Sequence, residues 1–399
     1  MTFTHPIGAQ LTVDALTRNP YPLFQQMHTT APICWAPAFH LWMVTRRADV
    51  ITILRDAETY TMEPAGAQIN PMADIFGPMM LSIDGPEHKA IRDVFAEPFR
   101  ARLVQERYQL LIAAIAEKLI DELPDRATVD LDKAFADELA IYTIVAALGL
   151  DIDNAAQFRE WYDDFAIALG NTTNEPALRQ QGKRTFAHFH ALVTAQIARV
   201  RQEPNASVLS HIVHHNTHNL SHDQIVSNIA LTFFGGVETA SALLANTIWA
   251  LLRHPEQCAE VRQDPKLMAA AIAESLRWEA PVQSAMRFPT RDVTLHDVPI
   301  KAGEKIYCML GAANRDPAFF PEPDRFDIHR PNADKHLSFA YGPHYCFGAP
   351  LALLEGEIGL TILLQRLPEV QLHPDHLTAP RGHEFRAMPT LLCAVGKKR

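Results

Sequence analysis

The sequence predicts a mainly α-helical protein with small β-sheets. Apolar residues recur at helical spacing over most of residues 85–253, and strand-like runs are confined to two short regions. One helical series is Leu103, Leu110, Leu111, Ile115 and Leu119. Hydrophobic residues make up 48% of the 399 and charged residues 21%. This balance supports a large buried core and excludes an intrinsically disordered chain.

The N-terminal region predicts mixed structure. Asn19 and Pro20 cap a short helix that runs from Tyr21 to His28. Two apolar runs follow, Ile33–Trp35 and Leu41–Val44, and we expect them to pair as strands.

The segment from Pro64 to Leu81 is rich in Pro, Gly and Met and has no clean period. It predicts a long, partly ordered loop, and loops of this length in compact proteins are often functional.

A long apolar helix is expected near the middle of the chain. It starts near Ser221, extends for about thirty residues and is apolar on most faces, so it should cross the interior. Pro255 ends it and lies in the first turn of the next helix. A membrane span over Ile229–Leu252 is disfavoured because Glu238 near its centre would cost roughly 2.5–3.5 kcal/mol.

The C-terminal third alternates short strands with turns. The expected strands are Arg287–Pro289, Val293–Leu295 and Lys305–Met309. A Pro/Asp-rich coil follows from Asn314 to Pro331, and the last helix is expected from about Phe347 to Leu367.

Charge and cysteine usage restrict the partners and the compartment. The net charge is −10 and Lys/Arg runs are missing, which argues against nucleic acid or an anionic membrane as the main partner. Five scattered cysteines without C-x-x-C spacing fit a reducing, cytoplasmic compartment. The N-terminus lacks the pattern of a signal peptide, and no membrane anchor is expected.

The most informative segment runs from Phe339 to Gly348 and reads F-x-x-G-x-H-x-C-x-G. Gly342 permits a tight turn at a φ that most residues avoid. Cys346 lies just before a predicted helix, whose free N–H groups stabilise a thiolate. Gly348 leaves room for something flat and large. The ordinary alternative is a buried structural cysteine, but by composition the pattern should occur about 10⁻³ times by chance in such a chain.

This segment resembles the haem-binding signature of the cytochrome P450 family, the haem-thiolate monooxygenases, and the resemblance covers nearly the whole chain. It implies the cytochrome P450 fold, with a large helical part around a long central helix and a small strand-rich part. It also implies haem b as the cofactor, with Cys346 as axial iron ligand, Phe339 packed by the sulfur and backbone N–H groups bonded to it. A thiolate ligand favours O–O cleavage.

Glu274 and Arg277 match the family's E-x-x-R motif on a predicted helix. The resemblance implies a structural role, in which the pair forms a buried salt bridge with the coil near Arg325 or Arg330. The same spacing occurs twice more, at Glu97–Arg100 and Glu322–Arg325, which we attribute to chance.

The long helix contains the segment G-G-V-E-T, with two adjacent glycines that each cost roughly 1 kcal/mol relative to Ala. Either a local opening for a small molecule or a packing notch, with Thr239 bonded to the Gly235 carbonyl, would explain them. The segment resembles the family's oxygen-activating motif. That implies a proton relay through Glu238 and contact of Thr239 with oxygen or its water.

His88 and Arg92 form the only H-x-x-x-R of the chain, on a helix opened by Pro86, and the spacing places both on one face. A solvated helix face is the ordinary alternative. In the family this pair binds the haem propionates, and Arg287 and His344 match the other positions that do so. Two carboxylates in a largely apolar slot need such charge-assisted donors.

The resemblance also implies an apolar substrate pocket, covered by the loop 64–81 and a helix pair around residues 158–190. The side chains expected to face it are Phe76, Met79, Met80, Leu231, Phe234, Gly235, Val282 and Met286. The expected substrate is a hydrophobic small molecule such as a fatty acid, terpenoid, steroid-like or polyketide compound.

Electrons are expected from a separate protein, because no flavin or iron–sulfur sequence follows residue 399. The resemblance suggests a ferredoxin-type donor with its reductase, and O₂ as co-substrate. A local basic rim could steer the donor despite the net charge. Its candidates are Lys89, Arg100, Arg102, Lys335 and His336.

A histidine cluster is a competing signal for a metal site. It comprises His211, His214, His215, His218 and His222. No Glu, Asp or Cys is expected to complete a ligand set, so a solvated connection before the long helix is favoured.

Together these features predict one domain over residues 1–399, a monooxygenase that hydroxylates or epoxidises its substrate. One alternative is a haem-thiolate peroxygenase or an isomerase/dehydratase, against which Glu238 and Thr239 argue. Another is a haem-based gas sensor or carrier, against which the same proton-relay residues argue. A helical scaffold without haem would require every motif to be accidental.

Overall fold

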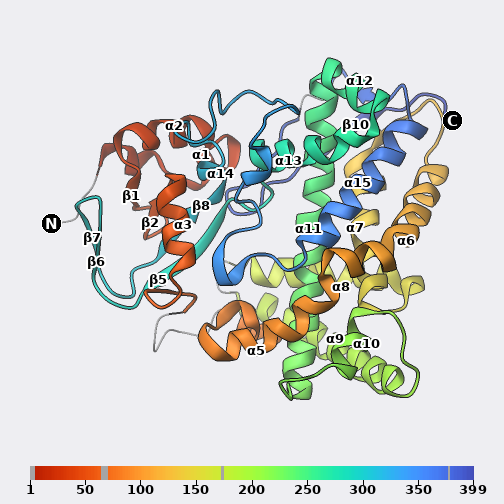
Figure 1. Ribbon diagram of the computed structural model, residues 1–399, viewed down its shortest axis with the longest axis horizontal. Coiled ribbons are helices and arrows are strands. Elements are labelled where there is room, and N and C mark those ends of the chain that lie inside the picture. The colour runs from red at the N-terminus through yellow and green to blue at the C-terminus, as the bar shows by residue number, and fades with distance from the viewer. Residues whose placement is uncertain (1–4, 64–70, 172–174, 376–377) are drawn as a thin grey trace.

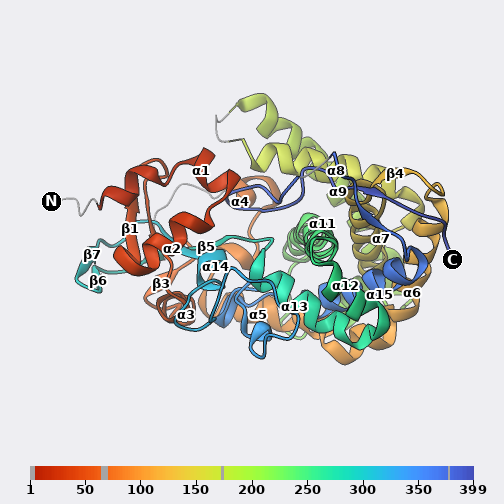
Figure 2. The same cartoon turned by 90° about the horizontal axis from the view of Figure 1, so that it is seen from above.

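The computed structural model describes residues 5–63, 71–171, 175–375 and 378–399. A strand-rich part and a larger helical part lie side by side, and both views show this arrangement (Figures 1 and 2). The mainly helical class with small sheets is as the sequence predicts.

The strand-rich part is built on a five-stranded sheet in the order β1-β2-β8-β5-β3. Its strands are β1 (Ile33–Ala36), β2 (Leu41–Val44), β3 (Tyr60–Thr61), β5 (Ser284–Pro289) and β8 (Ile306–Met309). The expected pairing of the first two strands is confirmed, with Ile33 opposite Val44 in an antiparallel register. Strand β8 then joins β2 in parallel. The sheet therefore combines segments that lie far apart in the sequence.

Two smaller sheets complete the strands. A hairpin joins β6 (Val293–Leu295) to β7 (Val298–Ile300), and a three-stranded sheet combines β4 (Thr128–Asp130), β10 (Leu392–Ala394) and β9 (Gln371–Leu372). The sequence pattern did not predict the short strands β3, β4, β9 and β10, nor β7 of this hairpin. Its turn consists of His296 and Asp297 with φ of 47° and 65°, and it lacks the glycine that usually signals a hairpin turn.

Helices make up the rest of the regular structure. In the strand-rich part they are α1 (Val13–Arg18), α2 (Tyr21–Thr30), α3 (Arg47–Arg55) and α14 (Leu310–Ala313). In the helical part they are α4 (Pro71–Phe76), α5 (Gly85–Ala96), α6 (Ala101–Glu122), α7 (Asp137–Leu148), α8 (Ala155–Leu169), α9 (Pro176–Gln202), α10 (Val208–His214), α11 (His222–Arg253), α12 (Pro255–Gln263), α13 (Met268–Trp278) and α15 (Ala349–Arg366).

Helix α11 is the long central helix that the sequence predicts (Figure 1). Ser221 caps it, and Gln224 completes a capping box in which each side chain bonds the other's backbone N–H. It is the one described helix long and apolar enough to span a membrane, but 72% of its apolar window is buried inside the protein. Its hydrophobicity is that of a core helix.

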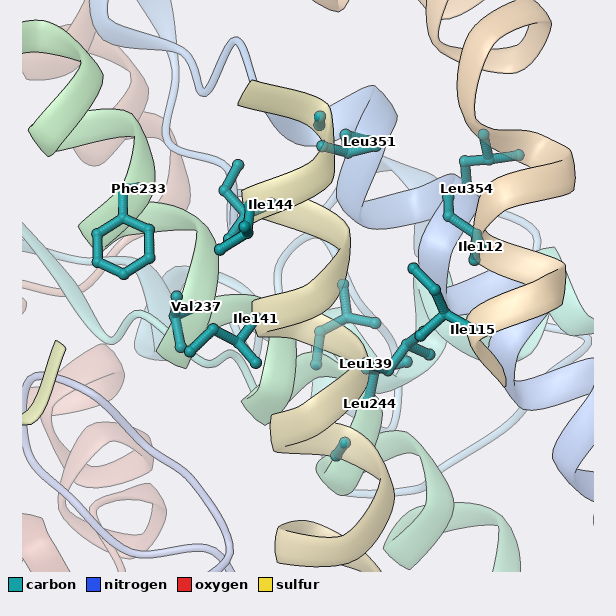
Figure 3. Close-up of a cluster of buried hydrophobic side chains, with 14 of the residues drawn as sticks. Ile112, Ile115, Leu139, Ile141, Ile144, Phe233, Val237, Leu244, Leu351 and Leu354 are labelled. Atoms are coloured by element: carbon teal, nitrogen blue, oxygen red, sulfur yellow. The ribbon is translucent and has the colours of Figure 1, made fainter. Parts of the chain in front are cut away.

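The main core forms where α11 meets its neighbours. Figure 3 shows side chains from four helices in this cluster. They are Ile112 and Ile115 of α6, Leu139, Ile141 and Ile144 of α7, Phe233, Val237 and Leu244 of α11, and Leu351 and Leu354 of α15. This packing fixes α11 and the start of α15 relative to each other.

The expected loop between Pro64 and Leu81 is only partly tested. Residues 64–70 lie outside the described residues, and for residues 71–81 the expectation is wrong. They form α4 and the 3₁₀ turn Met80–Ser82. The irregular apolar pattern reflects burial, because Ile75, Phe76, Met79 and Met80 are all at most 4% exposed.

Candidate active site

A cavity of about 550 Å³ lies between the two parts of the molecule. Its walls include residues of α5, α7, α8, α11, β5 and β8, the segment 338–348, the start of α15 and the residue pair Glu384 and Phe385. The volume is within the usual range for small-molecule sites. Among the described lining residues Cys346 is the only cysteine.

The loop before α15 presents Cys346 to this cavity. Gly342 adopts φ 74°, and a Cβ there would lie 2.4 Å from the Leu54 carbonyl oxygen, so only glycine fits. The Cys346 N–H donates to the Phe339 carbonyl at 2.9 Å, which closes the loop. Gly342 does not itself appear on the described cavity wall. Its place in the motif is explained by the turn.

The surroundings of the Cys346 thiol shift its pKa in opposite directions. Burial raises the pKa of Cys346 above its ordinary value, while the backbone N–H groups of Gly348 and Ala349 and the charge of Arg92 lower it. These N–H groups lie at the start of α15, where the sequence predicts donors to a thiolate. A Cβ on Gly348 would meet only the Cys346 Sγ, at 3.7 Å, so the space over the sulfur is open.

The four predicted basic residues line the same cavity although they come from three separate elements. His88 and Arg92 lie on α5, Arg287 on β5 and His344 in the turn before Cys346. The rings of His88 and His344 are 4.1 Å apart, and His344 Nε2 lies 2.8 Å from Asp84 Oδ1. Arg92 also donates to the Tyr345 carbonyl.

This basic group has donors without acceptors. His88 Nε2 and Arg287 Nε are buried and have no hydrogen-bond partner among the described residues. Burial, together with the neighbouring charges of His344 and Arg92, lowers the pKa of His88 to about 4. A group that carries two carboxylates would supply the missing acceptors and offset the crowded positive charge. The residues present therefore fit a haem with its propionates.

The two glycines of α11 have different surroundings. A Cβ on Gly235 would meet nothing within 4 Å, and this residue faces the cavity. A Cβ on Gly236 would lie 2.8 Å from Ile144 of α7, which is a packing notch. An opening for a small molecule thus explains Gly235, and a packing notch explains Gly236. Thr239 lines the cavity and donates to the Gly235 carbonyl at 2.6 Å.

Glu238 is held by Tyr162, a residue that no sequence motif indicated. The hydroxyl of Tyr162 on α8 donates to Glu238 Oε2 at 2.7 Å, and both residues line the cavity. The Tyr162 ring stacks on Phe234 with centroids 5.3 Å apart. Burial and the Glu238 charge raise the pKa of Tyr162 far above its usual range, so it stays a donor. No spacing in the sequence links these residues.

The E-x-x-R pair is fully buried outside the cavity. Glu274 and Arg277 are both 0% exposed and share two hydrogen bonds of 2.6 and 2.8 Å. Arg277 also donates to the carbonyls of Asn314, Pro323 and Arg325, and Arg330 donates to Glu274. The pair thus holds the coil before the Cys346 loop.

Six of the eight expected pocket residues line the cavity: Met80, Leu231, Phe234, Gly235, Val282 and Met286. The expectation is wrong for Phe76 and Met79, which are absent from the described wall and only 0% and 1% exposed. Phe76 packs edge-on against Phe165, with centroids 4.9 Å apart. Helix α4 places Phe76 in the core, and Met79 is buried just before the 3₁₀ turn Met80–Ser82.

The cavity wall includes two acidic residues that the sequence did not single out. Glu355 on α15 is buried, which raises its pKa to about 8. Glu384 accepts a hydrogen bond of 2.7 Å from the Tyr307 hydroxyl. The position of Glu355 one turn beyond Leu351 on the cavity side of α15 could have signalled it, but Glu384 has no such local signal.

The five histidines do not gather into one site. His214 bonds the Val200 carbonyl, His218 approaches Asp93, and His211 stacks on His215. His222 alone joins other potential ligands, because His190 of α9 and Asp223 place their donor atoms with its own within 4.8 Å of one another. The expectation that no Glu, Asp or Cys completes a ligand set was wrong for His222, because Asp223 joins this group.

Most of the expected basic rim is ion-paired. Lys89, Arg100, Arg102 and Lys335 each contact a carboxylate close in sequence. Burial lowers the pKa of His336 to about 4, so it is neutral at pH 7. The rim therefore carries less free positive charge than the sequence suggests.

Comparison with known proteins agrees with this chemistry. Residues 158–381 match the family Cytochrome P450. The biotin biosynthesis cytochrome P450 of Bacillus subtilis is 30% identical over 92% of this chain and 93% of its own. The vitamin D(3) 25-hydroxylase of Pseudonocardia autotrophica is 31% identical over 89% and 88%.

A solved structure extends the similarity to three dimensions. P450BioI in complex with a hexadec-9Z-enoic acid ligated acyl carrier protein has a TM-score of 0.86 and 29% identity, and the match covers 96% of this chain and 99% of that one. A cysteine at the head of a helix, facing an open cavity beside unpaired basic groups, is what a haem with a thiolate ligand requires. The chain is therefore an enzyme of the cytochrome P450 family, the haem-dependent monooxygenases.

Proposed function

We propose that this enzyme hydroxylates or epoxidises a hydrophobic small molecule in the cavity beside Cys346. One observation carries the proposal: the thiol, the four basic residues, Glu238 and Thr239 all line a single cavity whose other walls are mainly apolar. When bound, haem supplies the activation of O₂ and the oxidation of the substrate. Relatives named for vitamin D(3) hydroxylation and for a bound hexadecenoic acyl group support a hydrophobic substrate.

The haem would be held from two sides. Cys346 is the proposed axial ligand, with the Gly348 and Ala349 N–H groups directed at its sulfur to stabilise negative charge. His88, Arg92, Arg287 and His344 are the proposed partners of the propionates. Phe339 and Gly348 would border the ring, and both lie on the cavity wall.

Proton delivery is the proposed task of Glu238 and Thr239. The Glu238 carboxylate faces the cavity and keeps one oxygen free of the Tyr162 hydrogen bond, so it can take up and pass on a proton. Thr239 uses its own hydrogen on the Gly235 carbonyl, which leaves its oxygen as an acceptor toward the cavity. The apolar side chains around them, such as Leu231 and Phe234, would exclude bulk water.

Electrons would come from a separate ferredoxin-type protein with its reductase. Lys89, Arg102 and Lys335 are already paired with carboxylates of this chain. Docking of the donor would therefore replace these ion pairs with ion pairs to the donor. We further propose a cytoplasmic location, since all five cysteines are free.

One spectrum tests the proposal. Reduced protein with CO should give the strongly red-shifted Soret band of thiolate ligation, and Cys346→His should abolish it. The matched control is Cys258→Ala, a buried cysteine on α12 away from the cavity, which should keep the band. A wild-type protein without this band would refute haem–thiolate ligation. Product formation from peroxide but never with O₂ and a ferredoxin system would favour a peroxygenase instead.

A further inference from the structure

We propose that the substrate pocket selects uncharged or cationic molecules and rejects carboxylates, and that Glu384 with Tyr307 recognises a cationic or hydrogen-bond-donating group of the substrate. This inference rests on the proposed function, since it assigns four basic residues of the cavity to the haem. It narrows the range of hydrophobic substrates by excluding free fatty acids.

Glu384 is held at the cavity wall by several elements. It lies in the turn between Arg381 and Ala387, whose backbones exchange two hydrogen bonds of 2.8 and 3.1 Å. The Gln283 N–H donates to the Glu384 carbonyl at 2.8 Å, and Val282 pairs with Phe385 as an isolated bridge. The turn is thereby fixed to the segment that leads into β5.

Tyr307 orients the carboxylate from the neighbouring strand. It lies on β8 directly opposite Met286 of β5, which also lines the cavity. Its hydroxyl donates to Glu384 Oε1 at 2.7 Å. Burial and the charge of Glu384 raise the pKa of Tyr307 far above its usual range, so it remains a donor. No Lys, Arg or His forms an ion pair with Glu384 in the described part of the chain, which leaves Oε2 able to accept from a ligand.

The other ionisable side chains on the cavity wall explain why the pocket would reject a carboxylate ligand. The basic residues on the described wall are His88, Arg92, Arg287 and His344, which cluster near Cys346 and would face the propionates. No described cation on the wall is then left for a substrate carboxylate. A buried carboxylate without a partner is strongly disfavoured.

Three acidic residues lie on the described cavity wall, and they differ in whether they can bind a ligand. Glu355 is mainly protonated at pH 7 because burial raises its pKa to about 8, and Glu238 is assigned to proton delivery beside Thr239. Glu384 is thus the carboxylate available to a ligand. Phe385 beside it is 40% exposed and also lines the cavity, so its ring face can add to the attraction of a cation.

The test compares three ligands with the same ten-carbon chain in the holoenzyme: decyltrimethylammonium, 1-decanol and decanoate. A quaternary ammonium cannot coordinate iron, so it reports on the pocket alone. Dissociation constants come from the substrate-type spin shift and independently from equilibrium dialysis at low salt. We expect the ammonium to bind on the order of tenfold more tightly than the alcohol, and decanoate to bind most weakly.

Variants locate the effect. Glu384→Gln should remove the preference for the ammonium over the alcohol and leave the affinity for 1-decanol within about twofold. Glu256→Gln is the matched control, because it changes the net charge equally at an exposed position away from the described cavity wall. An equal loss of preference in both variants would attribute the effect to overall charge and refute the inference.

Two further outcomes keep the inference separate from the proposed function. If Glu384→Gln fails to fold, the ratio of the two affinities in the wild type must still decrease as salt rises, and a salt-independent ratio would refute the inference. Tight binding of decanoate to a protein with a normal CO spectrum would overturn the selection rule alone. Loss of the thiolate band in the wild type would instead overturn the proposed function.

Discussion

At the scale of residues, burial separates motifs that share a spacing. Glu274–Arg277, Glu97–Arg100 and Glu322–Arg325 all read E-x-x-R and all form ion pairs. The first is 0% exposed at both side chains, whereas the Glu322 and Arg325 side chains are 75% and 63% exposed. Solvent screens the exposed pairs, so only the buried one is a strong structural constraint.

Glu274→Gln should therefore destabilise the protein by about 3–5 kcal/mol, because it leaves Arg277 and Arg330 buried without a compensating charge. Glu322→Gln should change the free energy of unfolding by less than about 1 kcal/mol. Urea unfolding followed by circular dichroism measures both. Equal effects of the two substitutions would contradict the structural role of the buried pair.

At the scale of elements, α11 combines two functions in adjacent residues. Gly236 allows α7 to pack closely through Ile144, and Gly235 keeps the cavity wall free of a side chain. Either substitution to Ala would gain roughly 1 kcal/mol of helix propensity. The steric surroundings decide whether that gain survives.

Gly235→Ala should raise the free energy of unfolding by up to about 1 kcal/mol, since the added methyl group meets nothing within 4 Å. Gly236→Ala should lower it by about 1–2 kcal/mol, because the stiff Ile144 side chain must move to relieve a contact of 2.8 Å. Thermal unfolding of the pair provides the measurement. A stabilised Gly236→Ala variant would show that α7 yields easily and that the notch is not required.

At the scale of the whole molecule, the site depends on the contact between its two parts. Met286 and Tyr307 come from the sheet, and Glu238 and Cys346 from the helical part, yet they line one cavity. A bound cofactor would couple the two parts further, because a ligand stabilises the state that binds it.

That residues 1–399 form one domain remains a prediction. We expect the holoenzyme to unfold in one transition, with the Soret band and the far-ultraviolet circular dichroism changing at midpoints within about 2 °C of each other. Two separated transitions in differential scanning calorimetry would show that the strand-rich and helical parts are independent units.

Local motifs in the sequence were sufficient to identify the family and to select most of the residues of the proposed haem site. The turn at Gly342, the helix after Cys346 and the i,i+4 spacing of His88 and Arg92 each follow from a few neighbouring residues. Such features depend on backbone conformation and helical periodicity, which short segments encode.

Contacts between distant segments depend on the packing of the whole chain. Tyr162 meets Glu238 across 76 positions and Tyr307 meets Glu384 across 77. The same packing turns Phe76 into the core and separates His214 from His222. No spacing rule relates residues on different elements, because their distance is set by how helices and strands pack together. The position of the cysteine could thus be read from its own neighbourhood, but the charges that a substrate would meet became evident only from the folded chain.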